Sequence, residues 1–107
     1  AQNQGIRAAL ADGFGWVLLL DDDSEPAPGM VSALLSAASG GLAAPRVIER
    51  ALDQPVRYLV PRGRWCFAKV EARPGAVLEG ALFAIASGTL VPAEAFRRIG
   101  LMNPGYF

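Results

Sequence analysis

The sequence predicts an α/β fold in which a mostly parallel sheet is flanked by helices. The first observation behind this prediction is the run Trp16–Leu20, five successive apolar residues. Such a run is typical of a strand buried on both faces, as in parallel sheets. The second is the helical apolar spacing before and after this run, over residues 2–12 and 29–39. The helix, a glycine turn and the buried strand are expected to form the second half of a βαβ unit whose first strand is absent.

Composition supports one globular domain. The chain has 107 residues, of which 52% are hydrophobic and 19% charged, so it can bury a modest core. Its ten basic and ten acidic residues cancel, and a neutral chain carries no electrostatic footprint for nucleic acid. Because the sequence starts in a helical pattern without Met, we expect residues 1–107 to be an internal piece of a longer protein.

The first helix is predicted over residues 2–12. Ile6, Ala9 and Leu10 lie on one helical face, which favours packing of that face on the sheet. Gly13 suits the position just past the helix end, where a left-handed backbone is common.

Two further helices are predicted over residues 29–39 and 92–99. Pro28 comes directly before the first of these ranges and Pro92 opens the second, while Gly40 and Gly100 follow their last residues; these are the signals that start and stop helices. The side chains expected to face inward are Met30, Leu34, Leu35 and Ala38 in the second helix, and Phe96 and Ile99 in the third.

The remaining strands are predicted from short apolar runs between turn residues. We expect a short strand over residues 42–44, a loop over 45–56, a hairpin pairing 57–60 with 65–71, and a strand over 77–86 that ends at Ser87-Gly88-Thr89.

Two features of the hairpin leave alternatives open. Trp65 either stacks on a sugar face or fills the core. The arginines 57, 62 and 64 either meet phosphate, which guanidinium groups bind bidentately, or form a solvated surface.

Three carboxylates, Asp21, Asp22 and Asp23, follow the buried strand directly, and Ser24 comes next. Ligands of open α/β sheets bind at the carboxyl ends of strands, and adjacent carboxylates repel one another unless a cation meets them. The chain has no His and one Cys, so a metal here must be held by oxygen ligands, which suits Mg²⁺ or Mn²⁺. The alternative is a solvated turn that caps the next helix.

Two known motifs share part of this pattern. Haloacid-dehalogenase-like phosphatases use the first Asp of an Asp-x-Asp pair as nucleophile and have Thr two residues after the second, where this chain has Glu25. An EF-hand loop is excluded because Pro26 occupies the position of its glycine and Ser32 that of its final Glu.

A third resemblance covers nearly the whole chain apart from residues 45–75. The segments are Gln2-Asn3-Gln4-Gly5-Ile6, Ala11-Asp12-Gly13, Trp16 to Pro26, and Ala86 to Pro92 with Phe96 to Leu101. In order and separation these segments resemble the family 2 glycosyltransferases, and among them the rhamnosyltransferase-type members. The resemblance implies that residues 1–107 are part of a catalytic domain with the GT-A fold, a Rossmann-like sheet without its first strands and C-terminal part.

The resemblance also implies the roles of individual residues. Asp21, Asp22, Asp23, Ser87 and Gly88 would bind a nucleotide-sugar donor. Asp23 would be the direct ligand of Mg²⁺ or Mn²⁺, and Asp21 would face the ribose or the water around the metal. Transfer to an acceptor hydroxyl would invert the anomeric centre. The first strand, which holds the nucleotide base in such enzymes, is absent here, and the catalytic base is expected in an acidic segment after Phe107. Residues 1–107 alone should therefore bind metal and donor poorly and catalyse nothing measurable.

The function expected from the sequence is therefore transfer of a sugar, for which the resemblance suggests rhamnose, to a polysaccharide or glycolipid in the cytoplasm, with peripheral association at the inner face of the cell membrane. A phosphatase fragment and a degenerate domain kept for binding stay open as alternatives.

Overall fold

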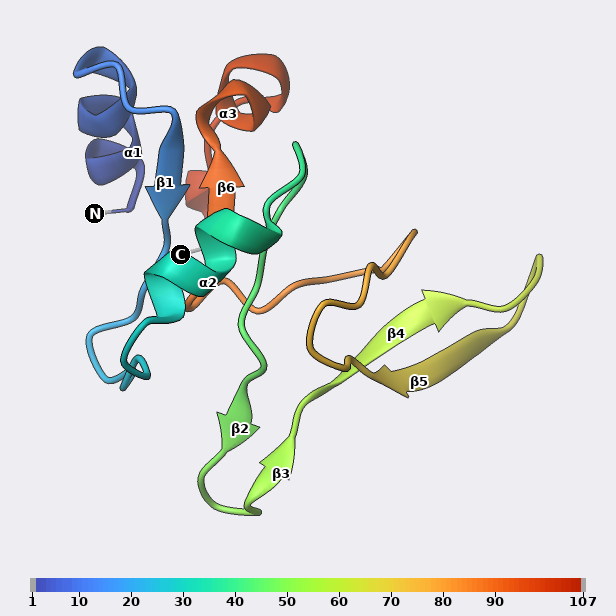
Figure 1. Cartoon of the computed structure of the whole chain (residues 1–107). Helices are drawn as coiled ribbons and strands as arrows, with labels where there is room; N and C mark the ends of the chain where they lie inside the picture. The colour runs from blue at the N-terminus through green and yellow to red at the C-terminus, as the bar shows by residue number, and fades with distance from the viewer. Residues whose placement is uncertain (1, 107) are drawn as a thin grey trace.

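The structure is a computed structural model that describes residues 2–106 (Figure 1). Its elements in chain order are α1 (Gln2–Ala11), β1 (Trp16–Leu18), α2 (Met30–Ala37), β2 (Ile48–Glu49), β3 (Gln54–Pro55), β4 (Arg57–Pro61), β5 (Phe67–Glu71), β6 (Leu90–Pro92), α3 (Ala93–Ile99) and the 3₁₀ turn η1 (Pro104–Tyr106). None of the helices in this part of the chain is long and apolar enough to cross a bilayer.

The predicted parallel, Rossmann-like sheet is wrong. The strands of residues 2–106 form three two-stranded pairs, β1–β6, β2–β3 and β4–β5, and each pair is antiparallel. Figure 1 shows β1 and β6 side by side with opposite directions. The chain returns to β1 at the end where β1 finishes: the Gly88 amide donates to the Leu19 carbonyl (2.6 Å), and further on the Ala93 amide donates to the Gly15 carbonyl (2.9 Å). A strand that starts at the C-terminal end of β1 and pairs with it must be antiparallel to it.

Strand β1 is also shorter and less enclosed than its apolar run predicts. Val17 and Leu19 are buried, Trp16 and Leu18 are half-buried, and Leu20 is 45% exposed. Trp16 lies opposite Pro92. Because proline has no amide hydrogen, it fits this position only if the pair is not hydrogen-bonded, as antiparallel alternation allows here. An apolar run predicts that a segment is buried, but the partner strand determines how many of its residues are paired and buried.

The β1–β6 pair separates two apolar clusters. One face carries Ile6 of α1, Val17 and Leu19 of β1, Val91 of β6 and Phe96 of α3. The other face carries Leu34 of α2, Ala43 and Leu90, with Trp16, Leu18, Met30 and Ala38 packed against them. Successive residues of a strand point to opposite faces, so β1 and β6 each contribute to both clusters. Helices therefore cover both faces of a narrow antiparallel ribbon.

Helix α1 ends as its sequence predicts. Gly13 has a φ of 80°, the amide of Phe14 donates to the Ala9 carbonyl (3.1 Å), and the Gly13 amide donates to the Leu10 carbonyl (3.3 Å). These two bonds form a Schellman motif. The motif turns the chain directly into β1.

Two predicted inward side chains point to solvent instead. Leu35 of α2 is 47% exposed and Ile99 of α3 is 84% exposed, whereas Leu34 and Phe96 are buried. Each short helix meets the ribbon along a stripe of about one residue per turn, so the neighbouring apolar position stays outside.

The middle of the chain differs most from prediction. Residues 45–56, expected as a loop, contain the β2–β3 hairpin, whereas residues 77–86, expected as a strand, have no regular structure. The predicted strand over residues 42–44 is reduced to one bridge between Ala43 and Leu90. The β4–β5 hairpin is confirmed, with Tyr58 paired to Val70 and Val60 to Ala68. Trp65 is 85% exposed, so its interpretation as a core residue is wrong.

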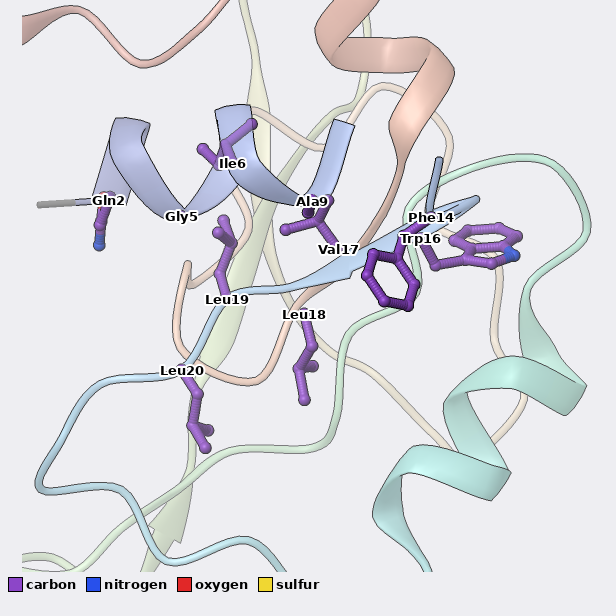
Figure 2. Close-up of a pocket in the computed structure, with 10 residues that line it drawn as sticks. All are labelled: Gln2, Gly5, Ile6, Ala9, Phe14, Trp16, Val17, Leu18, Leu19 and Leu20. Atoms are coloured by element: carbon purple, nitrogen blue, oxygen red, sulfur yellow. The ribbon is translucent and has the colours of Figure 1, made fainter. Parts of the chain in front are cut away.

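An open groove of about 390 Å³ borders β1 and α1 (Figure 2). Its walls include Gly5 and Ala9 of α1 together with Trp16, Leu18 and Leu20. Because residues 17 and 19 direct their hydrogen bonds to β6, the backbone groups of residues 16, 18 and 20 point to the opposite edge.

Candidate functional site

The acidic turn, residues 21–25, lies at the end of β1 where the strand leaves the ribbon. The Ser24 amide donates to the Asp21 carbonyl (3.2 Å), which closes a tight turn around Asp22 and Asp23. All three aspartates are exposed, and Ser24 is half-buried. The three aspartates are therefore accessible to solvent or to a ligand.

Ser87 connects this turn to a segment more than 60 residues away in sequence. The Ser87 hydroxyl oxygen accepts a hydrogen bond from the Asp21 amide (3.1 Å). It also shares a hydrogen bond of 2.5 Å with the Ser24 hydroxyl. The structure thus brings together the acidic turn and the Ser-Gly segment, the two places where the sequence predicts a donor site.

Gly88 sits where only glycine fits. Its φ is 82°, and a Cβ built on it would lie 2.6 Å from Cγ of Pro45. The backbone of the Ser-Gly segment consequently approaches both the ring of Pro45 and the carbonyl of Leu19. This close packing fixes the position of Ser87 beside the acidic turn.

Thr89 holds the same segment from the other side. Its side chain is buried, at 3% exposure. Its hydroxyl donates to the Ile85 carbonyl (2.5 Å) and its amide to the Ala86 carbonyl (3.0 Å). These bonds close residues 85–89 into a compact turn and hold Ser87 beside the acidic turn.

An arginine that the sequence does not predict at this site reaches the acidic turn. Arg50, in the turn between β2 and β3, forms an ion pair of 2.5 Å with Glu25. The hydrogen bond that the Arg50 guanidinium donates to the Glu25 carboxylate, and the negative charge of that carboxylate, raise the pKa of Arg50. Both side chains are largely exposed, so the pair contributes little to stability. The sequence of residues 45–56 does not predict the β2–β3 hairpin. Because this hairpin positions Arg50 near Glu25, the sequence could not predict the ion pair either.

The donor atoms of the turn suit a hard divalent cation bound together with phosphates. Within residues 2–106, no three acidic, His or Cys side chains converge into a cage that would hold a metal by protein ligands alone. Mg²⁺ commonly needs only one or two carboxylates when phosphate oxygens and water complete its shell. Exposed aspartates on one turn fit a cation that is completed by phosphate and water, and do not fit a cage made of protein ligands alone.

Comparison of the chain with protein family models, curated proteins and solved structures finds no match.

Proposed function

We propose that this chain is the donor-binding part of a metal-dependent, inverting glycosyltransferase that uses a nucleotide sugar. The observation that supports it is the contact of Ser87 with the backbone of Asp21 and the hydroxyl of Ser24. It joins the two segments in which the sequence resembles rhamnosyltransferase-type family 2 enzymes.

Each residue of the site has a role in this proposal. Asp23 would hold Mg²⁺ or Mn²⁺ next to the diphosphate of the donor, and Asp21 would accept a hydrogen bond from the ribose. When bound, the cation offsets the negative charge that builds up on the departing diphosphate. Asp22 adds to the negative field that attracts the cation. Ser87 holds the turn in place, and Gly88 lets the Ser-Gly segment pack against Pro45 beside the turn.

The acceptor would be a glycan or glycolipid hydroxyl, with the chain located in the cytoplasm at the inner face of the membrane. An attacking hydroxyl must lose a proton to a base. None of the exposed acids outside the turn is assigned this role, because none lies in a segment that resembles the family's base.

The first test measures Mn²⁺ binding by paramagnetic broadening of amide signals, with and without UDP or dTDP. We expect broadening centred on residues 21–25 and 87–89, strengthened by the nucleotide. Asp23→Asn should weaken binding by tenfold or more, because the direct carboxylate ligand is lost. Asp53→Asn serves as the matched control, since it removes one exposed carboxylate from the β2–β3 turn and should change nothing. Broadening spread over all acidic residues, equal in both variants, would contradict the proposal.

A second measurement separates sugar transfer from the phosphatase alternative. A phosphatase would form an aspartyl phosphate at Asp21, which beryllofluoride mimics. We expect no beryllofluoride-dependent change in the signals of residues 19–25, whereas a slow-exchange shift confined to them would favour the phosphatase. A degenerate domain would bind neither Mn²⁺ nor nucleotide in the first test.

A further inference from the structure

Positive charge is concentrated on one hairpin of this neutral chain. The segment from Arg57 to Glu71 contains four basic residues, Arg57, Arg62, Arg64 and Lys69, and one acid, Glu71. Glu71 is occupied by an ion pair with Arg46 (2.8 Å). Among residues 2–106, none of the four basic side chains of the hairpin forms an ion pair. The hairpin thus presents uncompensated positive charge to its surroundings.

The hairpin tip, residues 61–67, combines this charge with exposed aromatic rings. The Arg62 amide donates to the Cys66 carbonyl (2.8 Å), so Gly63, Arg64 and Trp65 form the three-residue loop at the end. Trp65 is 85% exposed, and Phe67, paired with Pro61, is 55% exposed. A tryptophan in water forgoes more burial energy than almost any other side chain.

The position of the hairpin tip indicates the shape of its partner. In Figure 1, the β4–β5 hairpin extends away from the β1–β6 ribbon, with the loop between its strands at the far end. The face of the hairpin that carries Tyr58 and Val60 is buried, and Phe83 packs on the ring of Tyr58. Phe67 and Lys69 alternate with this buried face and therefore point outward. A projecting, convex tip suits a broad surface better than an elongated ligand lying in a groove.

We propose that the hairpin tip docks on the surface of an anionic lipid bilayer. Trp65 and Phe67 lie at the headgroup level, where amphipathic aromatic rings are favoured. Arg62 and Arg64 pair with lipid phosphates, and Lys69 and Arg57 add attraction from higher up the hairpin. The proposal depends on the charge complementarity between the four unpaired cations and a negative membrane. It does not depend on the proposed sugar transfer.

The experiment uses Cys66, the chain's one cysteine, which is exposed at the tip. An environment-sensitive fluorophore on this thiol reports entry into the interface. With vesicles of phosphatidylcholine and phosphatidylglycerol we expect a blue-shifted, brighter signal that high salt reverses. With phosphatidylcholine alone we expect little change. Sedimentation of the unlabelled chain with the same vesicles checks that the label does not cause the binding.

Two variants and one control complete the test. Arg62→Gln with Arg64→Gln should lower vesicle binding about 30-fold, roughly fivefold per arginine. Trp65→Ala should lower it about tenfold without removing the salt dependence. Arg7→Gln with Arg98→Gln removes the same charge from helices α1 and α3, and should leave binding within about twofold.

Other outcomes would overturn the proposal. Equal binding to neutral and anionic vesicles, or equal losses in the tip and control variants, would show that the tip is not a charge-selective anchor. Binding to a single-stranded oligonucleotide with no response to vesicles would assign the tip to nucleic acid instead. Native circular dichroism of each variant shows that a loss of binding is not a loss of folding.

Discussion

At the scale of single residues, the site depends on backbone conformations that few residues adopt. Gly88 and Gly13 have nearly the same φ, 82° and 80°. They differ in their surroundings: Gly13 has no atom within 4 Å of a built Cβ, whereas Gly88 faces the ring of Pro45 at 2.6 Å. The first position needs glycine for its backbone alone, and the second for backbone and space together.

This pair of glycines gives a prediction about stability. Gly13→Ala should lower the free energy of unfolding by about 1–2 kcal/mol, the cost of a left-handed residue with a Cβ. Gly88→Ala carries that cost plus the displacement of Pro45, so its loss should exceed that of Gly13→Ala by about 1 kcal/mol or more. Urea denaturation of both variants measures the difference. Equal losses would mean that the segment around Gly88 moves freely away from Pro45.

At the scale of elements, the sequence predicts the bounds of α3 correctly but not which of its apolar side chains are buried. Pro92 before the helix and Gly100 after it fix the bounds Ala93–Ile99, close to those that the sequence predicts. Phe96 and Ile99 are three residues apart, a spacing that puts both on one side of a helix. Only Phe96 packs against the β1–β6 pair, whereas Ile99 is exposed. The angle at which α3 leaves β6 decides between them, and no local pattern encodes that angle.

The two side chains can be compared directly. Phe96→Ala should destabilise the chain by about 3–5 kcal/mol, because it empties the centre of the cluster between α1 and β1. Ile99→Ala removes an 84% exposed side chain and should change stability by less than about 0.5 kcal/mol. Thermal unfolding followed by circular dichroism measures both. A comparable loss for Ile99→Ala would show that this side chain is covered in solution.

At the scale of the whole molecule, the two apolar clusters share one ribbon, and the β4–β5 hairpin contributes to neither. Residues of α1, α2 and α3 meet across β1 and β6, whereas the hairpin is supported mainly by its own pairing and by residues 82–83. The molecule also separates its charges, with the acidic turn at the end of β1 and the unpaired cations on the hairpin.

This arrangement predicts two levels of protection from hydrogen exchange. Amides paired between β4 and β5 should exchange through local opening, with a smaller free energy than the amides of Val17, Leu19 and Val91. Within β1, the amides of Trp16 and Leu18 face the open groove and should exchange faster than those of Val17 and Leu19. Exchange measured at several low urea concentrations tests both statements. Uniform protection throughout the chain would show that the hairpin and the ribbon unfold together.

The sequence by itself determined the local features of this protein. Glycine and proline signals place the ends of α1 and α3, and turn residues between two short apolar segments place the β4–β5 hairpin. The run of aspartates places a polar turn directly after β1. These features depend on the conformations of a few neighbouring residues, which is why sequence patterns can report them.

Only the tertiary structure decided how these pieces meet. The antiparallel direction of β6, its location at residues 90–92 instead of 77–86, and the exposure of Leu35, Trp65 and Ile99 all depend on partners far along the chain. An apolar side chain favours burial, but its hydrophobicity does not specify which strand or helix covers it. The hydrogen bonds of Ser87 to the acidic turn and the ion pair of Arg50 with Glu25 follow from the same long-range pairing.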